Sequence, residues 1–311
     1  MQPVAEVSVS PSQARSLVTA QFPSLAGQRV TLAGEGWDNT AYRVGRDWVF
    51  RFPRRAVGAG CLEHEIAVMP AVAARLDLPV SHAELVGEPT AGFPWRFAGH
   101  RWLPGRTSCS VRLDDDARGR LARPLGRFLA QLHAIDADTA RSLGAPEDEH
   151  DRVDPGGRVP RARQRIEQLV AEGLLPEAGP WFDALDDAAT RTGSLRPASA
   201  LVHGDLYARH LLVGSGGESA PGALLGVIDW GDVHAGEPAL DLAIVDLMLP
   251  PGPRAAFFDD YGTPDPATRS LARVRAIGHA AATGLWAHEV RDEGLLDASR
   301  WALGNALLAD G

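Results

Sequence analysis

The spacing of apolar residues divides this chain into two parts that must fold differently. Over residues 30–102 the apolar residues form short runs bounded by glycines, prolines and charged turns, which is typical of strands, and one amphipathic segment interrupts them. Most of residues 103–311 shows apolar residues at helical spacing instead, with a few short apolar runs in the middle. We therefore expect an α+β fold with a sheet-rich N-terminal lobe, residues 1–102, and a mostly helical C-terminal lobe, residues 103–311.

Individual elements follow from the same patterns. In the first lobe we expect a short capped helix after Ser10-Pro11-Ser12 and an amphipathic helix over Cys61–Leu76. The strands expected there are Val30–Leu32, Thr40–Val44, Trp48–Phe52, Leu85-Val86 and Trp95–His100. In the second lobe the charged, Pro- and Gly-rich segment 144–160 is interpreted as a loop. The helices expected there are Leu113–Ile135, Arg161–Gly173, Trp181–Thr190, Thr268–Val290 and Leu296–Leu308, and the strands are Leu201-Val202, Leu211–Val213 and Leu224–Ile228.

Composition and charge narrow the classes of function. Hydrophobic residues make up 45% of the chain and charged residues 23%, which is ordinary for a globular protein. The formal net charge of −9 opposes binding to nucleic acid and is compatible with a cationic small molecule. Two cysteines are too few for a disulfide framework, and the N-terminus shows no signal peptide. The apolar segment 240–250 is interrupted by Asp241 and Asp246, so we expect a cytoplasmic protein without a membrane partner.

Polar residues that suit phosphoryl transfer gather in residues 201–232, just after short apolar runs. Asp205 would accept the proton of an attacking hydroxyl. His210 stands five residues further on, where a metal ligand is needed, and Asp229 would bridge the metal ion to the phosphates of the donor. The kinase pattern H-x-D-x-x-x-x-N followed by an Asp at a strand end matches here at every position but one.

The first lobe supplies candidates for contacts to a nucleotide. Gly34 and Gly36 lie between two expected strands, where a flexible backbone could approach phosphates closely. Arg51 is the one cation in an apolar strand, and a buried cation needs an anionic partner. Glu63 and Glu65 on the next helix are the candidates for that partner. Glu65 lies nearer the apolar side of the helix, so it is the predicted partner.

These segments resemble the aminoglycoside phosphotransferase family, small-molecule kinases with a protein-kinase-like two-lobed fold. The resemblance covers roughly residues 30–250. The strongest matches are Leu201–Tyr207 with Leu211–Val213, and Gly226–Asp232 with Gly236, Pro238 and Asp241–Ala243. Weaker matches are Gly36–Asn39, Arg51–Arg54 and Trp102–Gly105. The last 60 residues match the family only in being helical.

The resemblance implies roles for residues of the second lobe. Asp205 resembles the catalytic base, and Asp229 resembles the carboxylate that binds the metal ion. Asp241 resembles a residue that steadies the catalytic loop from behind. His203, next to the base in this pattern, is interpreted as organising the loop through hydrogen bonds.

The resemblance also implies how the first lobe would hold a nucleotide. Arg51 stands at the position of a lysine that contacts the phosphates, with Glu65 as its partner on the helix. The segment 100–103, which includes Arg101 and Trp102, resembles the hinge that receives the nucleotide base. ATP and GTP remain equally open as donors.

Two positions depart from the family pattern. Every one of the 31 basic Lys or Arg residues is an arginine, and at Arg51 the planar guanidinium is not equivalent to an ammonium group. His210 stands where most members carry Asn, and imidazole suits Mn²⁺ better than Mg²⁺. Both departures resemble the macrolide-phosphorylating branch of the family.

The expected function is that of an enzyme, an NTP-dependent phosphotransferase that moves the γ-phosphate of ATP or GTP to a hydroxyl of a small molecule with Mg²⁺ or Mn²⁺. An antibiotic, an aminoglycoside or a macrolide, is the expected acceptor, with antibiotic resistance as the role. The first alternative is a kinase of a small metabolite alcohol. Two others are a metal-dependent phosphoesterase and a non-catalytic nucleotide-binding module. The oligomeric state stays open.

Several further residues allow two interpretations. The acidic stretch 147–151 is interpreted as a solvated loop, with attraction of a cationic acceptor as the alternative. Asp232 is interpreted as a turn residue rather than as a ligand of a second metal ion. Trp286 would line either the core or a pocket. His133 and His279, on apolar faces of expected helices, are interpreted as core residues.

Overall fold

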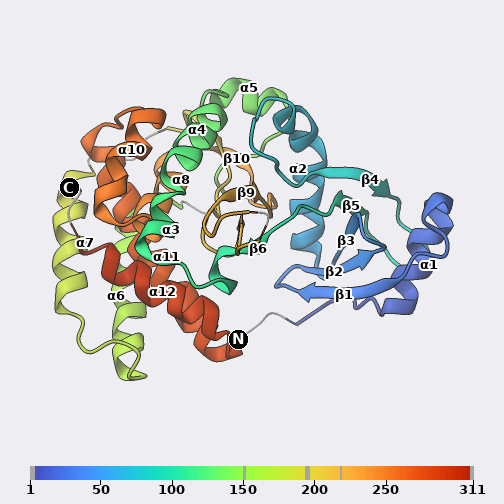
Figure 1. Ribbon diagram of the computed structural model, residues 1–311, viewed down its shortest axis with the longest axis horizontal. Helices are drawn as coiled ribbons and strands as arrows, with labels where there is room; N and C mark the ends of the chain where they lie inside the picture. Colours follow the sequence, from blue (N-terminus) through green and yellow to red (C-terminus); the bar gives the residue numbers. More distant parts are fainter. Residues whose placement is uncertain (1–3, 150–151, 193–196, 218, 309–311) are drawn as a thin grey trace.

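The protein has two lobes, as expected from the sequence. The computed structural model describes residues 4–149, 152–192, 197–217 and 219–308. Figure 1 shows a sheet with two helices at one end of the molecule, a group of helices at the other end, and short strands between them. The mixed α+β architecture predicted from the spacing of apolar residues is therefore confirmed.

The N-terminal lobe is built on one antiparallel sheet of five strands. Its strands are β1 (Val30–Glu35), β2 (Asn39–Val44), β3 (Trp48–Pro53), β4 (Ala83–Gly87) and β5 (Phe97–Arg101), arranged in the order β1-β2-β3-β5-β4. Helix α1 (Pro11–Gln21) begins at a capping box formed by Ser10 and Gln13 and is followed by the short 3-10 helix η1 (Pro23–Leu25). Helix α2 (Ala56–Ala73) begins five residues before the predicted Cys61, because its first turn carries no apolar periodicity.

Phenylalanines fill the core of this lobe. Phe50, Phe52, Phe93 and Phe97 are all buried, and the rings of Phe52 and Phe97 stack with centroids 4.8 Å apart. Alternate residues of β3 point to this core, which leaves Arg51 on the opposite face of the sheet. The aromatic core thus fixes the direction in which the Arg51 side chain leaves the strand.

Helix α2 packs beside the sheet and is also the one helix, within the described ranges, that is long and apolar enough to cross a membrane. Its mean hydropathy over 18 residues is 1.2. A single such helix is weak evidence for a membrane segment, because core helices pass the same test. Here Glu65 on α2 forms buried contacts with Arg51 of β3 and His100 of β5.

The C-terminal lobe holds ten helices and five short strands in the described part of the chain. The strands are β6 (Arg106–Thr107), β7 (Ala200–Val202), β8 (Leu211–Val213), β9 (Leu224–Val227) and β10 (His234–Gly236), which form the sheets β6-β8-β9 and β10-β7. The helices are α3 (Asp115–Gly119), α4 (Ala122–His133), α5 (Ala137–Ser142), α6 (Pro155–Ala171), α7 (Gly179–Arg191), α8 (Ala239–Leu242), α9 (Ile244–Met248), α10 (Pro251–Tyr261), α11 (Pro266–Val290) and α12 (Glu293–Asn305), with the 3-10 helix η2 (Ser108–Ser110).

Three expectations for this lobe differ from the structure. The single helix predicted over 113–135 is divided into α3, which Asp114 caps, and α4. The loop predicted over 144–160 ends early, because Asp154 caps α6 and Pro155 occupies its first turn. His150 and Asp151 of that loop lie outside the described residues. Helices α8 to α10 were not predicted, because two are too short to show a period and α10 has almost no apolar face.

The two lobes share a junction at the segment that follows α2. The amide of Ser81 donates to the carbonyl of Val227 at 3.0 Å, and the amide of Val227 donates to the carbonyl of Pro79 at 3.1 Å. Val68 and Met69 of α2 pack into the core of the C-terminal lobe. That core therefore extends across the expected boundary at residue 102.

Replacing Asp246 with Asn tests the buried charge network of the C-terminal lobe. Asp246 is fully buried and receives hydrogen bonds from Arg269 at 2.5 and 2.7 Å, with Arg254 at 3.5 Å. Asp246→Asn leaves buried guanidinium charge without its anion, so the free energy of unfolding in urea should fall by about 3–5 kcal/mol. Asp259→Asn, which removes an exposed partner of Arg123, should change it by less than about 1 kcal/mol. Equal effects of the two variants would contradict this assignment.

Candidate active site

The loop between β7 and β8 carries the predicted catalytic carboxylate. Gly204 has a φ of +82°, and a Cβ atom there would lie 2.4 Å from the carbonyl oxygen of Asp232. A side chain is therefore excluded at this position, and the tight turn that follows β7 depends on the glycine. Asp205 comes next, with its side chain 29% exposed to solvent.

Asp241 of α8 holds the backbone of this loop from behind. Its carboxylate is fully buried and accepts hydrogen bonds from the amides of His203 at 2.7 Å and Gly204 at 3.0 Å. Nε2 of His133 lies 3.2 Å from the same carboxylate, and Nδ1 of His133 lies 2.9 Å from the hydroxyl of Tyr261. Although burial acts to raise it, these contacts keep the pKa of Asp241 below its ordinary value. His133, which we expected to be a core residue, thus belongs to the support of the loop.

His203 links the two segments that carry the carboxylates. Its Nε2 lies 3.1 Å from the carbonyl oxygen of Ile228, the residue before Asp229. Its Nδ1 accepts the amide of Asp205 at 3.3 Å. Burial lowers the pKa of the imidazole, which favours the neutral form that these two bonds require. The organising role predicted for His203 agrees with this arrangement.

Three basic side chains surround the carboxylate of Asp205. The guanidinium of Arg275 and Nδ1 of His279 lie 3.5 and 3.7 Å from Oδ1, and Nδ1 of His210 lies 3.8 Å from Oδ2. Burial raises the pKa of the carboxyl, and the opposing effect of His210 does not cancel the rise. A carboxylate with a raised pKa accepts a proton more readily, which suits a general base. His279 was expected in the core, and it is buried but lies beside this group.

Asp229 meets two cationic partners at the end of the strand that precedes it. Nε2 of His210 lies 3.2 Å from Oδ2, and Arg51 donates a short hydrogen bond to Oδ1. Burial acts to raise the pKa of Asp229, but the charges of Arg51 and His210 hold it well below the usual range. The residue has a φ of 69°, a left-handed conformation that is uncommon outside glycine and is found at functional turns.

Arg51 joins the N-terminal lobe to this carboxylate. Its other arm donates to Oε2 of Glu65 at 3.1 Å, and Oε1 of Glu65 lies 2.6 Å from Nε2 of His100 on β5. Glu65 is only 1% exposed, whereas Glu63 binds Arg96 at the surface. The choice of Glu65 over Glu63 as the partner of Arg51 is confirmed. His100 was not expected in this network, because nothing in the sequence marks it as a partner of a carboxylate.

The donor atoms of His210 and Asp229 fit a divalent metal ion. Nδ1 of His210 donates to the carbonyl oxygen of Asp205 at 2.7 Å, which turns Nε2 toward Asp229. The separation of 3.2 Å between Nε2 and Oδ2 is close to the spacing of neighbouring ligands in an octahedron with bonds of about 2.1 Å. Among the residues that the structure describes, no three His, Cys, Asp or Glu side chains form such a group, so phosphates and water would supply the other ligands.

The expected nucleotide contacts lie on the inner face of the sheet and at its edge. A Cβ atom at Gly34 would meet no atom within 4 Å, so the packing of the protein itself does not require glycine there. Leu32 on the same strand is 54% exposed, which leaves an apolar side chain beside the glycines. Arg101 packs over the ring of Trp48, and the amide of Trp102 already donates to the carbonyl of Asp47 at 2.8 Å.

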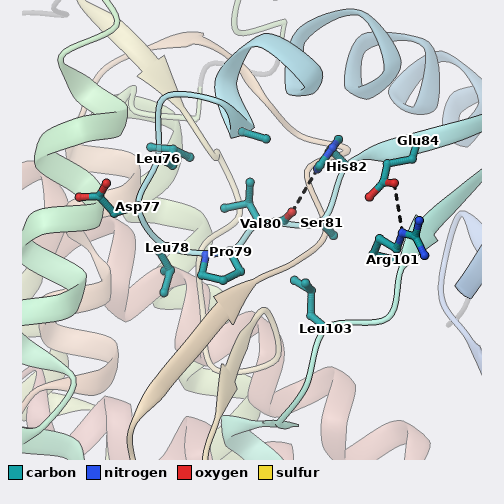
Figure 2. Close-up of a pocket in the computed structure, with 11 residues that line it drawn as sticks. Leu76, Asp77, Leu78, Pro79, Val80, Ser81, His82, Glu84, Arg101 and Leu103 are labelled. Carbon is teal, nitrogen blue, oxygen red and sulfur yellow. Dashed lines mark hydrogen bonds and ion pairs between the residues drawn. The ribbon is translucent and has the colours of Figure 1, made fainter. Parts of the chain in front are cut away.

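A separate cavity of about 280 Å³ lies behind the expected hinge. Figure 2 shows that it is lined by the segment that follows α2, from Leu76 to Glu84, together with Arg101 and Leu103. Arg101 is bound to Glu84 on its rim. The cavity therefore contains neither of the two catalytic carboxylates predicted from the sequence.

An aromatic contact joins the turn after Gly36 to helix α11. Trp37, in the turn after Gly36, packs edge-on against Trp286 of α11 with ring centroids 6.1 Å apart. The guanidinium of Arg209 lies over the ring of Trp286, with its Cζ atom 4.6 Å from the ring centroid. Sequence reasoning left Trp286 undecided and did not single out Trp37 or Arg209. Their meeting depends on how α11 packs, which no local pattern shows.

Comparison with known proteins is consistent with this geometry. The pattern described as the phosphotransferase enzyme family matches residues 29–276 of the chain. An uncharacterised protein of Bacillus subtilis, YcbJ, is 24% identical over 231 residues, which is 66% of this chain and 64% of the relative. The match thus spans less than two thirds of that relative.

Solved structures share the fold over nearly the whole chain. The GDP and kanamycin complex of APH(2″)-IIIa is 24% identical, covers 94% of this chain and 97% of its own, and has a TM-score of 0.66. The macrolide 2′-phosphotransferase MphH from Brachybacterium faecium is 25% identical, with the same coverages and a TM-score of 0.59. The protein-kinase-like two-lobed fold expected from the sequence is confirmed by these neighbours.

Replacing Asp241 with Asn tests whether this residue holds the loop. The side chain of Asn has one oxygen acceptor and one NH₂ donor group. The NH₂ group would face one of the two backbone N–H groups, so at least one hydrogen bond is lost. Hydrogen exchange at the amides of His203 and Gly204 should become faster by about tenfold or more, since a lost buried bond costs about 1–3 kcal/mol. Asp297→Asn, at a side chain that is 77% exposed, should leave both rates unchanged. Slow exchange in Asp241→Asn would refute the role.

Proposed function

Because the chain belongs to the phosphotransferase enzyme family, we propose that it transfers the γ-phosphate of a nucleoside triphosphate to a hydroxyl group of a small molecule. The observation that supports this most is the pairing of two carboxylates in different environments. Asp205 has basic groups around it and a raised pKa, whereas Asp229 is held ionised by Arg51 and His210. One carboxylate is thus suited to take a proton, and the other to bind a cation.

Asp205 acts as the base in the proposed reaction. The hydroxyl of the acceptor approaches its partly exposed carboxylate, which takes the proton as the oxygen attacks the γ-phosphorus. The bond from the γ-phosphorus to the bridging oxygen breaks, and the nucleoside diphosphate leaves in line. Asp241 and His203 keep the loop in place through the backbone bonds described above, so the base stays at a fixed position.

His210 and Asp229 are the proposed holders of a divalent metal ion, Mg²⁺ or Mn²⁺. Such an ion would neutralise charge on the donor phosphates. Arg51 occupies the same region, and its planar guanidinium suits bidentate binding of a phosphate. Glu65, which is itself bound by His100, holds Arg51 from the other side, so the cation keeps its position when Asp229 exchanges partners. Gly34 and Gly36 would then let the backbone approach the phosphates.

Two observations suggest classes of acceptor to test. The solved neighbours bind kanamycin or are named for macrolides, which makes aminoglycosides and macrolides the first compounds to test. A metabolite alcohol is the second candidate, favoured by arginines near Asp205 that are considered below. The donor is ATP or GTP, and the GDP in one neighbour supports a test of both.

A phosphoesterase is supported less well than a phosphotransferase. A metal-dependent phosphoesterase would need several ligands around a tightly bound ion, and Asp232 was one candidate. Asp232 instead binds Arg152 at 2.5 Å. Gly34, Gly36 and the position of Arg51 also have no use in that reaction.

The test of the reaction is the transfer of labelled γ-phosphate by the wild type and by Asp205→Asn. Wild-type protein should label a hydroxyl compound from a panel of aminoglycosides, macrolides and small alcohols, with ATP or GTP and either metal ion. Asp205→Asn should bind nucleotide normally and lose at least about 100-fold in turnover, because the general base is removed. Asp187→Asn, on the surface of α7, is the control. Wild-type turnover by Asp205→Asn would exclude this mechanism.

The variant His210→Asn tests the metal site. An amide oxygen is a harder ligand than an imidazole nitrogen, so the preference should move from Mn²⁺ toward Mg²⁺. The measurement is the ratio of turnover rates with the two ions. His288→Asn, at an exposed position near the end of α11, should keep the wild-type ratio. An unchanged ratio in His210→Asn would remove this residue from the metal ligands.

A further inference from the structure

One side of helix α6 carries a row of arginines toward the active site. Arg158, Arg161 and Arg165 are separated by three and four residues, so they lie along one side of the helix. Helix α6 runs beside α11 (Figure 1). Arg275 on α11 reaches the catalytic carboxylate, with its Nη2 atom 3.5 Å from Oδ1 of Asp205. The row on α6 therefore continues into the site through α11.

The contact between the two helices brings these guanidinium groups close together. Nη1 of Arg165 donates to the carbonyl of Gly278, which is one turn after Arg275 on α11, at 3.3 Å. Burial lowers the pKa of Arg165, and the charges of Arg275 and Arg161 lower it further. The same neighbours lower the pKa of Arg158 in addition to its burial. The positive charges are thus close enough to repel one another.

Two acidic residues whose charges act on Arg158 or Arg275 are engaged with another arginine. Asp148 and Asp232 both bind Arg152, at 3.0 and 2.5 Å. Glu147 binds Arg141 at 2.5 Å. The acidic stretch could have attracted a cationic acceptor. In its described part, residues 147–149, Glu147 and Asp148 are instead neutralised by arginines.

Two arginines of the row have no carboxylate of their own. Within the ranges that the structure describes, neither Arg161 nor Arg165 forms an ion pair with an acidic side chain. Arg275 faces Asp205, but that carboxylate is the one needed to receive the proton of the acceptor. Arg165 is partly buried and Arg161 is exposed. Guanidinium groups that repel one another are stabilised when an anion binds between them. The row thus has the charge and the spacing of an anion subsite.

We propose that the arginines of α6 and α11 bind an anionic group of the acceptor, a carboxylate or a phosphate, beside the hydroxyl that Asp205 deprotonates. The inference rests on the proposed phosphotransferase function and narrows its acceptor. Arginine binds carboxylate and phosphate through two parallel hydrogen bonds, which would also orient the acceptor toward the γ-phosphate. Arg161 and Arg165 are positioning residues for the acceptor.

The proposal separates two classes of acceptor. A hydroxy acid or a phosphorylated alcohol places its negative charge against the row and its hydroxyl near Asp205. A polycationic compound such as kanamycin brings ammonium groups into the same field and is repelled. The arginines therefore favour a small anionic alcohol over an aminoglycoside.

The first experiment measures anion binding at equilibrium. The protein is saturated with the β,γ-imido analogue of ATP or GTP, so that the γ-phosphate position is filled, and is titrated with inorganic phosphate and with glycerate by calorimetry. Arg161→Gln/Arg165→Gln should weaken this binding by about tenfold or more, because two charge-assisted contacts are removed. Arg163→Gln/Arg191→Gln removes the same charge from exposed ion pairs on α6 and α7 and should bind as the wild type does. Equal binding by all three proteins overturns the proposal.

The second experiment compares matched acceptors in the transfer assay. Hydroxy acids and their neutral counterparts, beginning with glycerate and glycerol, are tested beside kanamycin. We expect a higher kcat/KM for the acids than for their neutral counterparts. In Arg161→Gln/Arg165→Gln the KM of the acceptor should rise, while the KM of the nucleotide should stay the same. A preference for kanamycin overturns the proposal. A rise confined to the KM of the nucleotide also overturns it, because the arginines would then bind the donor.

The two experiments also separate this proposal from the proposed function. A protein that binds no nucleotide, or transfers no phosphate to any acceptor, fails the phosphotransferase test. In that case the phosphate titration is carried out on the protein without nucleotide, with the same two double variants. Loss of phosphate binding in Arg161→Gln/Arg165→Gln but not in Arg163→Gln/Arg191→Gln would still support the anion subsite. Equal phosphate binding by the two variants would exclude it.

Discussion

The guanidinium of Arg51 is the contact on which the two-lobed site depends. It extends from a strand of the N-terminal sheet and binds Glu65 of its own lobe and Asp229 of the other. A buried cation needs anions around it, so the strand, helix α2 and the carboxylate of the C-terminal lobe are held in one arrangement. His100 completes the network by binding the second oxygen of Glu65. The phosphates of a nucleotide would replace Asp229 as the anion, and the arrangement of the N-terminal lobe would persist.

A second carboxylate holds the loop that carries Asp205, the proposed base, through backbone contacts alone. Asp241 sits on α8, a helix of only four residues, and binds two successive backbone amides of the loop that carries Asp205. A contact to the backbone fixes the loop whatever side chains it bears. This explains why a fully buried charge is kept at this position.

Local patterns were sufficient for some of the fold and site. The two lobes, most strands and the pairing of Arg51 with Glu65 follow from the spacing of apolar residues and from the needs of a buried charge. Asp154 and Pro155 are also a recognisable start for helix α6, but the charged composition around them favoured the prediction of a loop. Arg275 and Arg165 could not have been found, because their roles arise from the packing of α6 on α11. The net charge of −9 averages over the whole chain, so it does not describe the charge beside Asp205.

The contact between Trp37 and Trp286 joins the turn beside the glycines to the helix that carries Arg275. The two rings belong to different lobes, so any widening of the cleft that releases a spent nucleotide must separate them. Separation exposes the touching parts of both indoles to water, while the guanidinium of Arg209, which belongs to the same lobe as Trp286, stays over that ring. Such a motion would therefore change the surroundings of two tryptophans, and their fluorescence would report it without any attached dye.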